Sequence, residues 1–194
     1  MFFRSERLFL RPVWAEDWKA IYQGICDEGV VKMLARAPWP YREEDARDFA
    51  VRAGQGVVEG SAQPKFAITL PDEDGAPLIG MIGIEPRESY DHEMGYWLAR
   101  KYWGRGYATE AGKAVLAVAR GIGLKRVLAG HFVDNPASGK VLRKIGFRPT
   151  GEIVREFGLG RGEHSAARRY FVDLCQEEGG DDDGGVFGSM PVAA

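Results

Sequence analysis

Few features of this 194-residue sequence point to export, to a membrane or to a metal site. It has two cysteines, Cys26 and Cys175, which form neither a metal-binding spacing nor a disulfide framework, so we expect a reducing, cytoplasmic location. Apolar runs are short: residues 114–119, the longest near the middle, fall far below the ~18 residues that a membrane span needs. Charged residues also interrupt the first ten positions, which argues against a signal peptide.

Neither sign of charge dominates, because the net charge at pH 7 is −2. Residues 177–194 hold five acids and no Lys or Arg, so the rest of the chain carries a small positive excess. That excess suits a phosphate-bearing ligand but is too small for a nucleic-acid surface, and we expect neither nucleic acid nor membrane as a partner. The composition predicts one domain over residues 1–175 and an acidic, glycine-rich, disordered tail over residues 176–194.

The order of the expected elements indicates a mixed α/β fold. The helix that joins the strands at 92–98 and 126–133 makes those two strands parallel. Its apolar stripe runs from Ala108 to Ile122, and Gly121 and Gly123 end the helix. The other expected elements are strands at 7–13, 65–70, 78–84, 153–158 and 166–174 and helices at 16–26, at 43–53 and from Pro136.

Two glycines, Gly104 and Gly106, stand at the strand-to-helix corner in the stretch YWGRGYATEA. One glycine is enough for a tight turn, so the second suggests that a ligand approaches the backbone. The start of a helix offers free N–H groups and a partial positive charge, which together bind anions. Two phosphate motifs do not fit: Thr109 replaces the third glycine of the dinucleotide fingerprint, and the distance from Gly106 to Gly112 is too long for a Walker A loop.

Together with DNPASGKVLRKIGF after the next strand, this corner resembles the GNAT superfamily of acetyl-CoA-dependent N-acetyltransferases. Within that superfamily it is most similar to the RimJ/RimL branch, which acetylates ribosomal-protein N-termini. Lys101, Gly104 and Gly106 fit the first family motif, with lysine at the usual Gln/Arg place. The spacing of the second motif is met by Asn135, Ser138, Gly146 and Phe147. The resemblance covers about residues 5–175.

The resemblance implies the GNAT fold, a mostly antiparallel sheet with flanking helices in which the parallel strands at 92–98 and 126–133 splay apart. It also implies that acetyl-CoA, the co-substrate, places its pyrophosphate on the glycine corner and its pantetheine arm along the backbone of the first of these strands. The structural alternative is that the glycines serve only as turn residues and that Asn135 is a helix cap. The cofactor-binding residues expected from the resemblance are Tyr96, Trp97, Leu98, Lys101, Gly104, Arg105, Gly106, Tyr107, Ala108, Thr109, Asn135 and Ser138.

The acceptor amine must be neutral to attack a thioester. An α-amino group, with a pKa of about 7.7–8.0, needs a weaker base than lysine, with a pKa of about 10.4. Asp91, His92 and Glu93 are candidate bases before the glycine corner. We prefer Glu93, because alternation places it on the same face as Gly95 and Trp97. The alternative is that Glu93 is a solvated carboxylate at a strand end.

The general acid must protonate the sulfur of coenzyme A as it leaves. Many GNAT members carry a tyrosine seven residues after the motif asparagine, but this chain has Leu142 there, which puts a tyrosine mechanism in doubt. The RimJ/RimL branch implies a serine, and Ser138 occupies its position; the alternative is that Ser138 is a small residue for close packing. His131 and His164 lack partners at metal-ligand spacing, so we expect no metal.

We therefore predict an N-acetyltransferase that moves the acetyl group of acetyl-CoA to a primary amine by direct attack in a ternary complex. The acceptor is a protein N-terminal α-amine or a small-molecule amine, and the enzyme is a monomer or a homodimer. The resemblance implies an acceptor site built by the first two helices and the last strands, with the loops at 35–42 and 156–165 as its candidate segments. Two alternatives remain open. One is an acyl-CoA sensor without turnover, which Leu142 keeps possible, and the other is an interaction domain with a purely structural corner.

Overall fold

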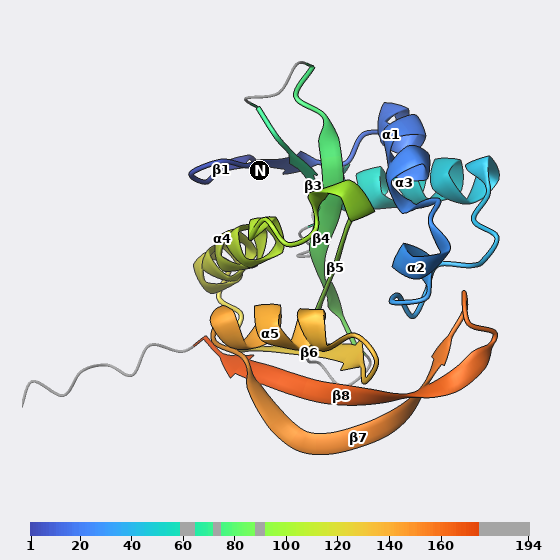
Figure 1. Cartoon of the computed structure of the whole chain (residues 1–194). Coiled ribbons are helices and arrows are strands. Elements are labelled where there is room, and N and C mark those ends of the chain that lie inside the picture. Colours follow the sequence, from blue (N-terminus) through green and yellow to red (C-terminus); the bar gives the residue numbers. More distant parts are fainter. Residues whose placement is uncertain (59–64, 72–74, 88–91, 175–194) are drawn as a thin grey trace, which may run out of the picture.

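The computed structural model describes residues 1–58, 65–71, 75–87 and 92–174, which form an eight-stranded sheet with helices on both faces (Figure 1). The strands are β1 (Phe3–Arg4), β2 (Phe9–Pro12), β3 (Lys65–Thr69), β4 (Leu78–Pro86), β5 (His92–Leu98), β6 (Arg126–Phe132), β7 (Arg148–Gly158) and β8 (Glu163–Asp173). The helices are α1 (Trp18–Ile25), α2 (Glu28–Val31), α3 (Glu43–Val58), α4 (Tyr107–Gly121) and α5 (Pro136–Lys144), with 3-10 turns η1 (Ala15–Asp17) and η2 (Arg100–Tyr102). The predicted tail and Asp91 lie outside the described residues.

The sheet has the strand order β1-β2-β3-β4-β5-β6-β8-β7, and among the described strands only β5 and β6 pair in parallel. Their pairing covers His92 with Val127, Glu93 with Leu128 and Met94 with Ala129, and then it stops. The remaining residues of both strands diverge. The predicted fold, a mostly antiparallel sheet with one splayed parallel pair, is confirmed.

The helices form two layers (Figure 1). α1 and α3 pack against each other on one face of the central strands, and α4 and α5 lie together on the other. Side chains of strand β5 contact helices on both faces of the sheet. The ring of Trp97 lies against Gly24 of α1, whereas the hydroxyl of Tyr96 contacts Ser138 of α5. Because side chains alternate along a strand, Glu93 shares the α1 face with Gly95 and Trp97, as predicted.

Helix α4 packs on the sheet through its apolar stripe, and the members of the stripe from Ala111 to Ala119 are buried as predicted. The last expected member, Ile122, is 37% exposed. The reason is that the helix ends at Gly121 and the chain reverses at Gly123, where φ is 81°. Among residues 1–58, 65–71, 75–87 and 92–174, no helix combines the length and the apolar composition that a membrane crossing requires.

Several boundaries differ from the sequence-based prediction. α3 continues to Val58, and the predicted first helix begins as the turn η1. β7 begins at Arg148 rather than 153, although residues 148–152 show no alternation, because β8 supplies its partner residues across a register shift. The prediction missed α2, whose first turn is capped by the carboxylate of Asp27. It also missed β1, which pairs with β2 over two residues.

Candidate active site

The glycine corner, residues 104–106, joins η2 to α4. Gly104 has a φ of 75° and Gly106 a φ of 83°, a left-handed conformation that other residues adopt only with strain. Gly106 is the N-cap of α4, and a Cβ atom at Gly104 would meet no atom within 4 Å. Both glycines are therefore required by the backbone, and the space around Gly104 is open.

The first N–H groups of α4 point out of this corner. Gly106 has no side chain to cap them, and in the described ranges 1–58, 65–71, 75–87 and 92–174 no group accepts a hydrogen bond from the N–H of Tyr107, Ala108 or Thr109. These donors coincide with the positive end of the helix dipole. The corner can therefore hold an anion such as a diphosphate on main-chain groups.

A cavity of about 870 Å³ begins at this corner and extends to α3 and the loops on the α1 face. Lys101 and Arg105 are the two predicted site residues that do not line it; their charged groups lie over the ring of Tyr102, at 4.9 and 5.8 Å from its centroid. The predicted residues that do line it are Glu93, Tyr96, Trp97, Leu98, Gly104, Gly106, Tyr107, Ala108, Thr109, Asn135 and Ser138.

The gap between β5 and β6 connects the two ends of the cavity. Residues 95–98 still pair with β4 and residues 130–132 with β8, but neither segment pairs with the other. The carbonyl of Leu98 accepts a hydrogen bond from the indole of Trp103 at 2.7 Å. The facing strand edges form a slot in which an extended ligand can add as a further strand.

Helix α5 begins at the mouth of this gap. Asn135 is its N-cap, with Oδ1 accepting from the N–H of Ser138 at 3.2 Å, and Pro136 occupies the first turn as predicted. The Ser138 hydroxyl lies 2.8 Å from that of Tyr96. Burial raises the pKa of Tyr96 to about 12, and the hydrogen bond with Ser138 offsets only part of that rise.

Glu93 lies on the other face of the gap and carries two ion pairs, to Arg87 at 2.6 Å and to Arg169 at 2.9 Å. Glu85 stands directly opposite it on β4, and two like charges in that position repel. Glu85 is neutralised by Lys65 at 2.8 Å and by Arg36. The carboxylates are therefore held in a cluster with matched cations rather than exposed singly.

Glu156 of β7 is a cavity carboxylate that the sequence analysis did not single out. It shares Arg169 with Glu93, at 3.2 Å. Arg169 reaches both because its ladder partner is Gly130, where a Cβ atom would lie 2.8 Å from the guanidinium. No motif marks Glu156, because only the β7–β8 hairpin brings it to Glu93.

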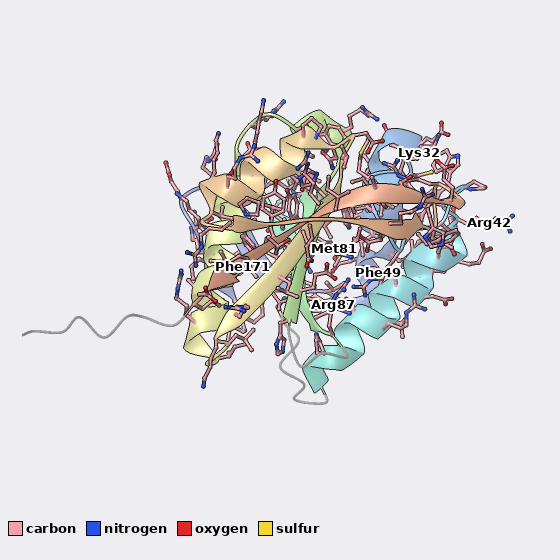
Figure 2. All side chains as sticks on the ribbon, turned by 90° about the horizontal axis from the view of Figure 1, so that it is seen from below. Lys32, Arg42, Phe49, Met81, Arg87 and Phe171 are labelled. Carbon is pink, nitrogen blue, oxygen red and sulfur yellow. The ribbon has the colours of Figure 1, made fainter. Side chains whose placement is uncertain are left out.

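The two loops expected to bind the acceptor lie together. The N–H of Leu159 donates to the carbonyl of Ala35 at 2.8 Å, and Arg161 donates to the carbonyl of Lys32 at 2.6 Å. Ala35 and Leu159 line the cavity, as do Phe49 of α3 and Met81 of β4, both labelled in Figure 2. This end of the cavity therefore combines apolar walls with the charged cluster.

Arg7 contacts the glycine corner and Glu110 of α4. The sequence analysis did not single it out. Its N–H and guanidinium bind Glu110 at 2.7 and 2.8 Å, and the guanidinium donates to the carbonyl of Arg105 at 3.1 Å. It also covers the ring of Tyr107 at 4.7 Å. Burial opposes ionisation of Glu110, but its hydrogen bonds from Arg7 and Ser5 outweigh burial and lower its pKa.

Comparison with known proteins decides the family. Residues 7–148 match the model of the acetyltransferase (GNAT) domain. The chain belongs to the GNAT family. It is an acetyl-CoA-dependent N-acetyltransferase of the RimJ/RimL-like kind. Within the described residues, no three His, Cys, Asp or Glu side chains gather in a way that could hold a metal ion.

Relatives match over most of their length. The chain is 31% identical over 153 residues to the uncharacterized N-acetyltransferase YnaD of Bacillus subtilis, covering 78% of this chain and 85% of the relative. It is 31% identical over 149 residues to the ribosomal-protein-serine acetyltransferase of Escherichia coli, covering 74% and 80%. A GNAT-family acetyltransferase structure from Bacillus anthracis superposes with a TM-score of 0.73 at 27% identity, covering 90% of this GNAT chain and 99% of that one.

Proposed function

We propose that this GNAT enzyme acetylates a primary amine of modest pKa, either a protein N-terminal α-amine or a small-molecule amine, by direct attack in a ternary complex in the cytoplasm. The observation that carries the proposal is the gap between β5 and β6, which opens to the glycine corner at one end and to the carboxylate cluster at the other. Two substrates entering from these ends meet at the gap. Proximity of this kind supplies much of the catalysis in a direct transfer.

Acetyl-CoA fits the residues on one side of the gap. The N–H groups of Tyr107, Ala108 and Thr109, which have no hydrogen-bond acceptor among the described residues, match the charge and the size of a diphosphate. The edge of β5 from Tyr96 to Leu98, which does not pair with β6 and whose Leu98 carbonyl accepts from the Trp103 indole, matches an extended arm with amide groups. The thioester then lies near the start of α5, where Asn135 and Ser138 line the cavity.

In the transfer, the neutral nitrogen attacks the thioester carbonyl, so that a C–N bond forms and the C–S bond breaks. Glu93 takes the proton that the nitrogen loses, and Ser138 gives its proton to the departing sulfur. The proton released by the amine returns to Ser138 through water, so one proton passes from nitrogen to sulfur overall. Glu156 is the alternative base, because it lines the same cavity and, among the described residues, has one ion pair where Glu93 has two.

The test is release of coenzyme A thiol from acetyl-CoA with a panel of amines. The panel contains peptides beginning with Ala, Ser or Met, free amino acids, polyamines and aminoglycosides. We expect turnover with a peptide or small amine whose pKa is near that of an α-amine, and faster turnover than with a lysine side chain. Turnover confined to lysine side chains would contradict the proposed acceptor class.

A second candidate function, an acyl-CoA sensor, is favoured by one observation. Leu142 is buried at the position where many GNAT members carry a tyrosine acid. Calorimetric binding of acetyl-CoA without turnover of any amine in the panel would select the sensor. Absence of binding at an acetyl-CoA concentration of about 100 μM would exclude both the enzyme and the sensor, because a working cofactor site binds more tightly than that.

A further inference from the structure

The phenol of Tyr96 has a place in the site beyond the backbone contact that the family motif implies. Its oxygen lies 2.8 Å from Oγ of Ser138, and both residues line the cavity. We propose that Tyr96 is a positioning residue; this inference rests on the proposed function. It donates a hydrogen bond to Oγ of Ser138 and so turns the serine hydroxyl hydrogen toward the thioester sulfur.

The direction of this hydrogen bond follows from the chemistry of the two groups. A phenol O–H is more acidic than an alcohol O–H, and its oxygen is the weaker acceptor because its lone pair is delocalised into the ring. Within the described residues, Ser138 is the partner of the Tyr96 hydroxyl. Burial raises the pKa of Tyr96 to about 12, so the donor stays protonated wherever the acceptor amine is reactive.

Two contacts hold the start of α5, and with it Ser138, beside Tyr96. The N–H of Ser138 donates to Oδ1 of Asn135 at 3.2 Å. The next residue, Gly139, packs so closely on the sheet that a Cβ atom there would lie 2.6 Å from Nε2 of His131. With its backbone held and its oxygen accepting from Tyr96, Ser138 has its own hydrogen left for the cavity.

This arrangement affects the departure of sulfur more than the binding of acetyl-CoA. A hydroxyl that already points at the sulfur stabilises the charge as it develops and does not have to reorient. Loss of the phenol leaves the serine present but free to rotate. The turnover number then falls, whereas the contacts that hold the diphosphate at the glycine corner are unchanged.

The test is a double-mutant cycle of Tyr96→Phe and Ser138→Ala, with Tyr22→Phe as the control for loss of a tyrosine hydroxyl outside the cavity. We expect Y96F to lower kcat about fivefold with the KM for acetyl-CoA within about twofold of wild type, the size of one lost hydrogen bond. We expect S138A to lower kcat about tenfold, and the double variant to match S138A, because the tyrosine acts through the serine. Y22F should keep the wild-type kcat.

Two results would overturn the inference while leaving the proposed function intact: wild-type kcat in Y96F, or losses that multiply to about 50-fold in the double variant, as for independent sites. Absence of turnover by the wild type would overturn both. If Y96F does not fold, 3,5-difluorotyrosine at position 96 keeps the shape and lowers the phenol pKa. The rate should then fall at a lower pH than in wild type, and an unchanged pH profile would contradict the role of the phenol.

Discussion

The two ends of the cavity are built in different ways. The end at which we propose that acetyl-CoA binds, the cofactor end, consists of six consecutive residues, 104–109, and presents main-chain N–H groups. The end at which we propose that the amine binds, the acceptor end, is a cluster of side chains from β3, β4, β5, β7 and β8, among them Glu93, Glu156 and Arg169. The first end is encoded in a short stretch of sequence, whereas the second exists only once the sheet has formed.

This difference has a functional consequence. Main-chain donors are present whatever the side chains are, so the cofactor end tolerates most side-chain substitutions, except those that alter φ or fill the corner. The acceptor end can change its charge and shape through single substitutions without disturbing the sheet. A GNAT enzyme can therefore keep acetyl-CoA and change its amine, which is why the fold alone does not name the acceptor.

The largest expected effect is at the glycine corner. Gly106→Val forces a β-branched residue to a φ of 83° and adds bulk beside the first N–H groups of α4, so we expect acetyl-CoA affinity to fall at least about 200-fold. Gly123→Val is the matched control, since Gly123 has a φ of 81° at the far end of α4. Calorimetry should show wild-type affinity for the control. Equal losses in both variants would mean that the corner acts only through stability.

The next largest effect tests the base. Glu93→Gln keeps the shape of the side chain and removes its proton-accepting charge, so kcat/KM for the amine should fall about 100-fold with acetyl-CoA affinity unchanged. Glu156→Gln is the paired variant, because Glu156 shares Arg169 with Glu93. If Glu156→Gln carries the loss and Glu93→Gln is near wild type, the base is Glu156.

A smaller effect should follow from moving Arg169. Gly130→Ala places a methyl group where the guanidinium lies, at 2.8 Å. Displacement of Arg169 separates the positive charge from Glu93 and Glu156, and we expect kcat/KM for the amine to fall about fivefold. Gly121→Ala, where a Cβ atom meets nothing within 4 Å, is the control. An unchanged KM and kcat in Gly130→Ala would show that Arg169 only stabilises the fold.

The smallest effect concerns stability around the corner. The pKa of Glu110 is lowered in the folded protein, so its ion pair with Arg7 stabilises the fold above the unfolded pKa of about 4.3 and is lost as the pH falls through the folded value. Arg7 is 42% exposed, and solvent screening limits the contribution to at most about 1 kcal/mol. Thermal melts of Glu110→Gln should show a lower Tm than wild type at pH 7. A difference of the same size at pH 3 would contradict this.

Sequence reasoning succeeded where the signal is local. The glycine corner, the Asn135 cap and the alternation of Glu93 with Trp97 each follow from a few neighbouring residues, and the structure shows all of them. The splayed strands were implied by the family motifs and are confirmed. Leu142 and Ser138 were placed correctly on α5 because both follow the cap at fixed spacing.

Sequence reasoning did not find contacts between distant segments. The β7–β8 hairpin brings Glu156 and Arg169 to Glu93. The register shift in this hairpin is not predicted by any pattern in residues 148–152. The Tyr96–Ser138 hydrogen bond joins residues from β5 and α5 and depends on how closely α5 packs on the sheet. Such contacts depend on register and packing, which local periodicity does not specify.

The most direct measurement is a crystal structure of the protein with acetyl-CoA bound. We predict that the diphosphate accepts hydrogen bonds from the main-chain N–H groups between Gly106 and Thr109, and that the arm runs between β5 and β6 with its sulfur beside Ser138. A diphosphate bound elsewhere, or strands β5 and β6 paired along their whole length around an empty corner, would contradict the account.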